Sequence, residues 1–522
     1  MERRAERRRL AWSTAIFSSA TGLSRLLGLV REIVAANYFG ARGQINAFTV
    51  AFQIPNLVRA LVADAALSSA FVPVFSELLE KGERARAWRV ASTVFWLFLL
   101  LVGGLTALFI LAAPLLMPPL TNAYDDLTVT LSQILFPIVV LLGLFGIVTG
   151  ILNSYDEFSI PALTPVAWNL AIIAGLMIGV PQADSESSKL YVYAGSIVAG
   201  TMLQLLLPLP WLRGRDGRLR LALDLRDPMV KQVFKLMGPV MLGLGLINVN
   251  AVIGTIVAAK WIDPTIAPSA IDKAFRIYML PQGMFSVAVA TVLFPSLARL
   301  ATRGDMDGFR DTISRGLRQI NFLLLPCAVF SVVLAEPIVR LLYERGAFEP
   351  DQTHVVAGAL AAFSVGLTFN GMMLMLNRGF FSLQSPWIPT VVALANLVLN
   401  VVLYAVFYRV GVWGIPLAIS IANIAGVAML VVALRRRVGR IDLTSTTRSF
   451  VLVAVASAAL AAVSYGVWRL LDDALGRSFG AQLLSLGSAL VLGGIVYVVA
   501  CKALRVREIE ALLSLRSRFR RA

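Results

Sequence analysis

The chain has 522 residues, of which 58% are hydrophobic and 15% are charged. Soluble proteins have about 45–50% apolar and about 25% charged residues, so this composition excludes an ordinary soluble protein. The apolar runs are also too long for the strands of a membrane β-barrel, which alternate over about 10 residues. One spanning helix needs about 20 apolar residues, so the length predicts an all-α polytopic membrane protein with roughly fourteen passes.

The chain is strongly basic, with 47 Lys and Arg against 30 Asp and Glu and a net charge of +17. In membrane proteins Lys and Arg collect in the cytoplasmic connections. We therefore expect no nucleic-acid partner, and we expect both termini to lie in the cytoplasm. The basic segments are the N-terminus, 77–89, 213–235, 299–318, 435–448 and the C-terminal tail.

The apolar runs predict the helices directly. The first run follows the basic segment MERRAERRR and is too long for the apolar region of a cleavable signal peptide, so we expect it to remain as a helix. Taken in chain order, the predicted helices are 11–37, 45–76, 87–117, 127–153, 159–181, 189–212, 230–260, 269–298, 318–343, 353–382, 386–408, 411–434, 446–470 and 480–502.

Cysteine and histidine are nearly absent. Cys327 and Cys501 both lie in apolar runs, where we expect them to be inert packing residues, and no disulfide framework or metal cluster can be built from them. The single histidine, His354, excludes a zinc site or a catalytic triad that depends on histidine. We expect no catalytic residues, no metal and no cofactor.

Several residues recur at a spacing of about 224 residues, which indicates duplication of a six-helix unit. Six helices are an even number, so both copies have the same orientation, an arrangement known among transporters with the substrate site between the halves. The sequence therefore predicts an N-terminal lobe over 1–225, a C-terminal lobe over 226–440, and an extra helix pair with a basic tail over 441–522. The recurring pairs are Pro55 and Pro281, Pro73 and Pro295, Asn153 and Asn377, Pro161 and Pro386, and Pro165 and Pro389.

Five of the ionisable residues inside the predicted spans are the most informative. Each Arg costs about 2.5–3.5 kcal/mol at the centre of a lipid-facing helix, so these side chains must line water, pair with acids or reach an interface. Acidic partners are few, and Gly and Pro interrupt the same helices, as expected where backbone lines a cavity. The five residues are Arg25, Arg31, Arg59, Asp64 and Arg276.

Arginine suits phosphate because its planar fork donates two parallel hydrogen bonds. A cavity with excess Arg therefore favours an anionic, phosphorylated substrate. The simpler alternative is that each arginine side chain extends to the membrane interface and contacts a lipid headgroup.

Specific segments of the chain resemble the MurJ (MviN) family of lipid II flippases, in the multidrug/oligosaccharidyl-lipid/polysaccharide (MOP) exporter superfamily. The resemblance covers essentially the whole chain. It is carried by SATGLSRLLGLVREIVAANYFGA (19–41), NAFTVAFQIPNLVRALVADAALSSAFVPVFSELL (46–79), GILNSYDEFSIPALTP (150–165), LPQGMFSVAVATVLFPSLARL (280–300) and LLYERGAFEPDQT (341–353).

The resemblance implies a bacterial cytoplasmic membrane protein of fourteen helices that moves the lipid-linked peptidoglycan precursor, lipid II, from the inner to the outer leaflet. It implies that the family's cavity arginines correspond to Arg25, Arg31, Arg59 and Arg276, and that Asn56 and Asp64 lie in the same site. It also implies a groove for the lipid tail beside the last two helices. We expect a monomer whose partners are lipid II, membrane lipids and the cell-wall synthesis machinery.

The chain departs from the family pattern at several acidic positions. Asn46 and Met279 stand where many members carry an acid, and Gln53 stands where many carry Lys. Some members bind sodium between helices, and Asn396 and Asn400 have a suitable spacing for such a site, although interhelical hydrogen bonding is the simpler interpretation. Candidate driving forces are the membrane potential, Na⁺ or H⁺.

Two basic segments, 304–318 and the C-terminal tail, predict contacts with the membrane surface. In 304–318, Met306, Phe309, Ile313 and Leu317 share one helical face, which predicts a helix lying in the cytoplasmic interface. In the tail, basic residues predict contacts with anionic lipids; these are Arg516, Arg518, Arg520 and Arg521.

Three alternative functions would each require different sequence features. An exporter of another polyprenyl-diphosphate oligosaccharide would share the architecture, whereas an exporter of cationic drugs should line its cavity with acids and aromatic residues. A sugar-transferring membrane enzyme needs paired carboxylates near a metal, and only Asp125 and Asp126 adjoin in the connections expected outside. A scaffold for cell-wall proteins would need a soluble domain, which the helix pattern does not contain.

Overall fold

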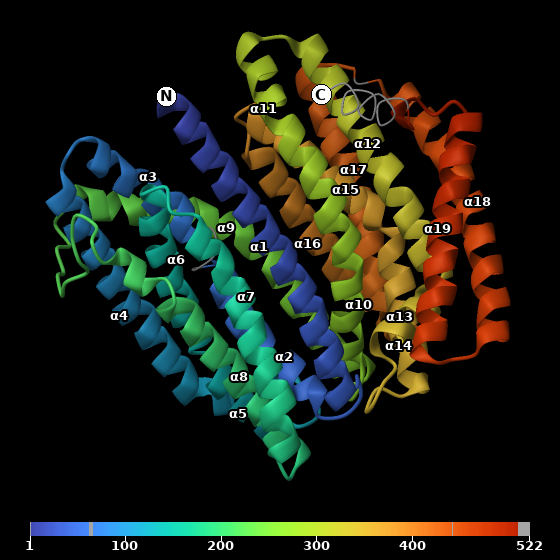
Figure 1. Cartoon of the computed structure of the whole chain (residues 1–522), viewed down its shortest axis with the longest axis horizontal. Helices are drawn as coiled ribbons and strands as arrows, with labels where there is room; N and C mark the ends of the chain where they lie inside the picture. Colours follow the sequence, from blue (N-terminus) through green and yellow to red (C-terminus); the bar gives the residue numbers. More distant parts are fainter. Residues whose placement is uncertain (1, 62–65, 441, 510–522) are drawn as a thin grey trace. The chain divides into compact units, whose positions relative to one another are not determined.

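The computed structural model describes residues 2–61, 66–440 and 442–509, and these residues form helices and no strand (Figure 1). The α-helices are α1 (Glu2–Phe39), α2 (Ile45–Arg59), α3 (Ala66–Glu80), α4 (Arg84–Leu116), α5 (Asp125–Leu135), α6 (Ile138–Ser154), α7 (Ser159–Ala174), α8 (Glu186–Leu206), α9 (Pro228–Val257), α10 (Ala267–Pro281), α11 (Val287–Arg303), α12 (Met306–Val333), α13 (Ala335–Tyr343), α14 (Pro350–Val365), α15 (Leu367–Ser382), α16 (Trp387–Phe407), α17 (Gly414–Val438), α18 (Leu443–Leu475) and α19 (Phe479–Ala503).

The helices confirm an all-α polytopic membrane protein. Among the described residues, ten helices are long and apolar enough to span a membrane, and the pair α14 and α15, bent by 43°, makes an eleventh. The other three predicted passes are also helical: 11–37 lies in α1, 45–76 is divided between α2 and α3, and 230–260 lies in α9 and the π-helix η6 (Ala258–Ile262).

The chain divides into two compact units, Met1–Pro268 and Ser269–Ala522. This boundary follows α9, whereas the repeat predicted a boundary between lobes near residue 225. The difference arises because α9 packs against α2 and α3 of the first unit. The division into lobes concerns duplication in the sequence and stays a prediction. The two compact units describe which helices pack together.

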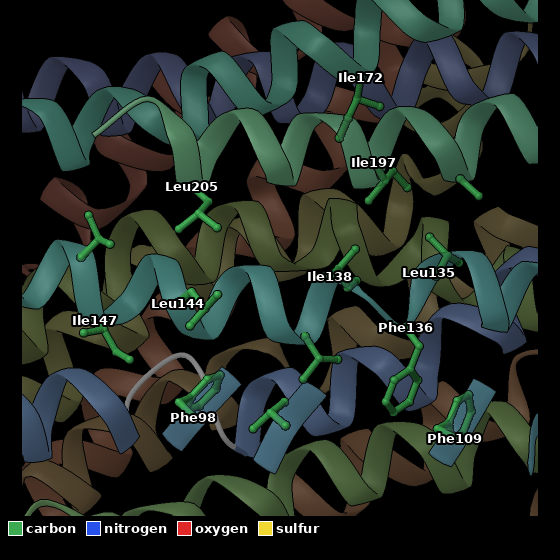
Figure 2. Close-up of a cluster of buried hydrophobic side chains, with 14 of the residues drawn as sticks. Phe98, Phe109, Leu135, Phe136, Ile138, Leu144, Ile147, Ile172, Ile197 and Leu205 are labelled. Atoms are coloured by element: carbon green, nitrogen blue, oxygen red, sulfur yellow. The ribbon is translucent and has the colours of Figure 1, made fainter. Parts of the chain in front are cut away.

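The first unit has a core of stacked aromatic and branched side chains, part of which Figure 2 shows. The rings of Phe109 on α4 and Phe136 between α5 and α6 stack with their centroids 3.8 Å apart. The opposite face of α4 is apolar and open, with Leu111 80% and Leu115 78% exposed. A helix that is apolar on its protein face and on its outer face is suited to hydrocarbon rather than to water.

In the second unit, α12 packs against α11, α14, α15 and α18. The hairpin of α18 and α19, which lie side by side in Figure 1, carries a separate apolar cluster with α12. The hydroxyl of Tyr497 in α19 donates to the backbone oxygen of Phe322 in α12 over 2.6 Å. This bond satisfies a buried hydroxyl that would otherwise be costly inside a membrane protein.

The prediction of an interfacial helix at 304–318 was wrong. Residues from Met306 onward form the first turns of α12, which continues to Val333. Phe309 and Ile313 are fully buried, and a side chain at Gly379 of α15 would touch both of them. The apolar face therefore packs against protein, and the pattern that predicts membrane contact fits a helix–helix contact equally well.

Candidate functional site

Arg31 lies in α1 and is almost fully buried, with 9% of its surface exposed. Its guanidinium pairs with the neighbouring Glu32, with Nη2 2.6 Å and Nε 3.2 Å from the same carboxylate oxygen. Glu32 is buried as well. A buried cation in a spanning helix is tolerated only with such a partner, so the two residues form one neutral unit.

The indole of Trp168 in α7 holds the other side of this unit. The Cζ atom of Arg31 lies 4.6 Å from the centroid of the Trp168 ring. The indole is itself oriented from α8, because its Nε1 donates to the hydroxyl of Thr201 over 3.1 Å. Three helices thus determine the position of one guanidinium, and only Arg31 was predicted from the sequence.

Arg25 lies two turns before Arg31 in α1 and is exposed. It forms no ion pair or hydrogen bond within the described part of the chain. The adjacent Ser24 accepts a hydrogen bond at its backbone oxygen from Asn169 of α7, 3.3 Å away. The backbone beside Arg25 is therefore anchored to α7 while the guanidinium itself stays available.

Asn56 and Arg59 lie one turn apart in α2 and contact each other. Arg59 donates from Nε and Nη2 to the side-chain oxygen of Asn56, over 3.1 Å and 2.8 Å. The structure thus brings two predicted site residues together. Asp64, the third predicted residue of this segment, lies outside the described residues.

Arg276 lies in α10 of the second unit, and Asp272 of the same helix accepts a hydrogen bond from its Nε over 2.8 Å. Asp272 was not predicted from the sequence. Its spacing of four residues from Arg276 is the spacing at which side chains meet on a helix, so the signal was present. The neighbouring Lys273 was also missed; it is buried, with its ammonium 5.5 Å from the centroid of the Tyr343 ring.

The four predicted arginines therefore belong to different parts of the chain. Arg25, Arg31 and Arg59 lie in the first compact unit and Arg276 in the second. Arg31 and Arg276 are each paired with an acid, so the positive surplus is smaller than the sequence predicts. That all four bind one headgroup stays a prediction.

Asn396 and Asn400 are buried on α16. The amide nitrogen of Asn396 lies 3.8 Å from the sulfur of Met373 in α15. The side-chain oxygens of both asparagines have no hydrogen-bond partner among the described residues. Asn396 thus forms an interhelical hydrogen bond, as the simpler interpretation expects, and the suggestion of a cation site stays a prediction.

Further residues singled out in the sequence are the two cysteines and the arginines of the C-terminal tail. Cys327 and Cys501 are both free thiols, as expected. The described residues contain no cluster of three or more His, Cys, Asp or Glu side chains that could hold a metal ion. The tail arginines, Arg516, Arg518, Arg520 and Arg521, lie outside the described residues.

Comparison with known proteins identifies a family. The sequence model of a family described as "Lipid II flippase MurJ" matches residues 35–479. A probable lipid II flippase MurJ from Rhizobium tropici is 32% identical over 496 residues, which cover 92% of this chain and 91% of the relative.

Solved structures give the same fold. A structure titled "Lipid II flippase MurJ, inward closed conformation" superimposes with a TM-score of 0.78 at 25% identity, covering 94% of this chain and 98% of that one. An inward-facing multidrug resistance MATE family transporter of the MOP superfamily gives a TM-score of 0.69 at 15% identity, covering 83% of this chain and 99% of that one. The second likeness shows the fold alone.

Proposed function

Because the chain belongs to the lipid II flippase MurJ family, we propose that it moves lipid II from the inner to the outer leaflet of the bacterial cytoplasmic membrane. It is a multi-pass transporter and not an enzyme. The structural observation that carries the proposal is the buried guanidinium of Arg31 in a spanning helix, held by Glu32 and Trp168. A side chain so costly to bury is expected at a substrate pathway.

The cargo presents one physical problem, which is that an unscreened diphosphate cannot cross about 30 Å of hydrocarbon. We infer that Arg25, Arg31, Arg59 and Arg276 supply the screening. Arg25 is open and can bind first, whereas the other three already hold Glu32, Asn56 or Asp272. A diphosphate can compete with these partners because it carries more negative charge than a single carboxylate or an amide, and its bonds to the arginine fork are charge-assisted and bidentate.

The lipid tail needs a separate surface. The hairpin of α18 and α19 exposes a long row of large apolar side chains, among them Leu490, Val491 and Val499. We propose that the tail stays in the bilayer and lies beside this hairpin while the headgroup crosses.

Net transport needs a driving force. Moving one elementary charge through the membrane potential is worth about 2.3 kcal/mol per 100 mV. Reloading the cavity with Na⁺, H⁺ or another cation is thus sufficient to bias the cycle. We propose that the protein works as a monomer with its termini in the cytoplasm, alongside the cell-wall synthesis machinery.

The experiment that tests this function is depletion of the protein, followed by measurement of how much lipid II an externally added hydrolase can reach. We expect lipid II to accumulate on the inner leaflet, out of reach of the hydrolase. Accumulation of a different polyprenyl-diphosphate oligosaccharide, with lipid II fully accessible, would instead favour the alternative cargo.

The site is tested by single Arg→Ala variants at Arg25, Arg59 and Arg276. Each is expected to abolish complementation of the depleted strain while its level in the membrane stays unchanged. Arg299→Ala is the matched control, because this exposed side chain near the end of α11 forms its one hydrogen bond within the described part of the chain with Ser296. Full complementation by all three site variants would contradict the role of the arginines.

A further inference from the structure

The spanning segment that carries Arg276 is broken near its middle. Helix α10 ends at Pro281, the π-helix η7 (Gln282–Ser286) follows, and α11 continues the span. Proline has no backbone N–H, so the helix loses one hydrogen bond at this point. A π-helix inserts one extra residue into the spiral, and each residue turns an α-helix by about 100° because one turn holds about 3.6 residues. The extra residue therefore determines which way Arg276 faces relative to α11.

The π-helix leaves polar groups unsatisfied. Ser286 is fully buried, and its hydroxyl has no hydrogen-bond partner among the described residues. The side-chain oxygen of Gln282 is also buried without a partner in this part of the chain. Buried polar atoms without partners cost free energy, and a costly local conformation persists only where its surroundings hold it. The support for η7 must therefore come from a neighbouring helix.

Asn370 of α15 supplies this support. Its side-chain oxygen accepts a hydrogen bond from Nε2 of Gln282 over 3.0 Å, at the first residue of the π-helix. Its side-chain nitrogen donates to the hydroxyl of Tyr278 over 2.7 Å, in the turn of α10 that precedes the break. An amide carries both a donor and an acceptor, and Asn370 uses one on each side of Pro281.

Packing fixes both partners of Asn370. Tyr278 is 2% exposed, and its ring centroid lies 5.3 Å from that of Phe363 in α14. The backbone of α15 lies directly against η7, because a Cβ added at Gly371 would be 2.5 Å from the hydroxyl oxygen of Ser286. Glycine at residue 371 therefore allows the neighbouring Asn370 to come within hydrogen-bond distance of the π-helix.

We propose that Asn370 is a positioning residue for Arg276: it holds the extra residue in η7 and thereby fixes the direction of the guanidinium. This inference rests on the proposed function, in which Arg276 binds the diphosphate. Arg276 lies two residues before Tyr278, so the bond from Asn370 to Tyr278 acts on the same turn of α10. Without Asn370 the π-helix is no longer held, and α10 gains a second orientation, rotated by about 100° towards that of a regular α-helix.

The proposal is tested by measuring the orientation of α10. A nitroxide is attached to one cysteine at a time in the purified full-length protein, in lipid nanodiscs without lipid II, and its collisions with oxygen and with a water-soluble nickel complex are measured. Met279 is on the exposed side of α10, whereas Ala274 and Ile277 are buried. The reporter substitutions are Met279→Cys, Ala274→Cys and Ile277→Cys, each combined with Cys327→Ala and Cys501→Ala.

Asn370→Leu removes both hydrogen bonds at a similar side-chain volume. We expect the nitroxide at residue 279 to become less accessible and the one at residue 274 or 277 to become more accessible, because a rotation of about 100° exchanges exposed and buried positions. A rise at all three positions would indicate general loosening of the helix. That result, or unchanged accessibility at all three, would overturn the proposal.

Asn377→Leu is the matched control, because it makes the same substitution seven residues further along α15. The side chain of Asn377 is partly exposed and forms no hydrogen bond within the described part of the chain, so we expect the parent accessibility at all three positions. Tyr278→Phe is a milder variant that keeps the ring and removes the hydroxyl. It should change accessibility in the same direction as Asn370→Leu but less, and an effect equal to that of Asn377→Leu would contradict the role of the hydroxyl.

Transport of lipid II in proteoliposomes is measured separately. We expect Asn370→Leu to raise the half-saturating amount of lipid II about tenfold, because a misdirected guanidinium loses charge-assisted hydrogen bonds, and to leave the maximal rate nearly unchanged. A fall in the maximal rate alone would indicate a structural defect and contradict the positioning role. Rotation of α10 without any change in transport would instead contradict the proposed role of Arg276 in binding the cargo, so the two failures are distinguishable.

Discussion

The carboxylate of Asp227 both caps α9 and binds the guanidinium of Arg86 in α4. It accepts from Nε and Nη2 of Arg86, each over 3.0 Å, and from the backbone nitrogen of Met229 over 2.9 Å. The connection leading to α9 is fastened to α4 elsewhere, since Trp96 donates to the backbone oxygen of Arg220 over 2.9 Å. The start of α9 is therefore anchored to the first unit.

This double role predicts different effects for two substitutions at one position. Asp227→Ala removes the cap and the ion pair, and loss of a cap costs about 1 kcal/mol. Asp227→Asn keeps a good cap and loses only the ion pair, which is worth little because Arg86 is 38% exposed. Hydrogen exchange of amides 229–232 should accelerate more in the alanine variant, and equal exchange in both would contradict the capping role.

The same carboxylate predicts a pH dependence. The Arg86 guanidinium holds the pKa of Asp227 below its usual value. A group of this kind contributes stability above its unfolded pKa of about 3.9 and loses it as the pH falls through the folded pKa. Protection factors at 229–232 should therefore fall in acid below about pH 4, whereas Asp227→Asn should show no such step.

The contact between the Arg31 guanidinium and the Trp168 ring predicts a role for Trp168 in transport. Trp168→Leu removes the π face and keeps an apolar side chain, so it loses a desolvated cation–π contact of about 2 kcal/mol. We expect lipid II transport in proteoliposomes to weaken clearly. Trp168→Phe keeps an aromatic face and should retain most of the activity, and equal activity of the two variants would exclude the contact.

The pair of Arg276 and Asp272 predicts that stability and function separate in α10. The two side chains are 35% and 30% exposed and lie four residues apart, so the pair stabilises the helix by only about 0.3–0.5 kcal/mol. Asp272→Asn should leave the melting temperature almost unchanged, whereas Arg276→Ala should abolish complementation at an unchanged melting temperature. A large drop in melting temperature for Arg276→Ala would assign it a structural role.

Adjacent aspartates in α18 offer a matched comparison. Asp472 pairs with the buried Arg340 of α13, and Asp473 pairs with Arg469 at the exposed surface. Removing one partner of a buried pair costs about 3–5 kcal/mol, and removing a surface pair costs at most about 1. Asp472→Asn should therefore lower the thermal stability of the purified protein much more than Asp473→Asn. Similar melting temperatures would show that Arg340 does not anchor the hairpin.

Local sequence predicted the helices well because hydrocarbon leaves the backbone few alternatives to a helix. Each of the fourteen apolar runs is helical over most of the residues that the structure describes. The prediction of an interfacial helix at 304–318 was wrong for a related reason. An apolar helical face shows that something apolar covers it, but the spacing of Phe309 and Ile313 does not say whether lipid or protein does so.

The polar contacts were far less predictable. Asp272 lies four residues before Arg276, a helical spacing at which a partner can be predicted, and Glu32 directly follows Arg31 in the sequence. Trp168 and Asn370 are remote from Arg31 and Gln282, and nothing in the local pattern indicates that they meet. The boundary after residue 268 was likewise invisible, because it depends on where α9 packs.

The amino-acid sequence by itself determined the class of protein, the positions of its helices, the orientation expected from its charges and the residues too costly to place in lipid. These depend on transfer free energies, which each residue carries with it. Tertiary structure alone decided which group satisfies each buried donor and acceptor. A hydrogen bond requires two atoms to meet within about 3 Å, and only the packing of distant helices brings them there.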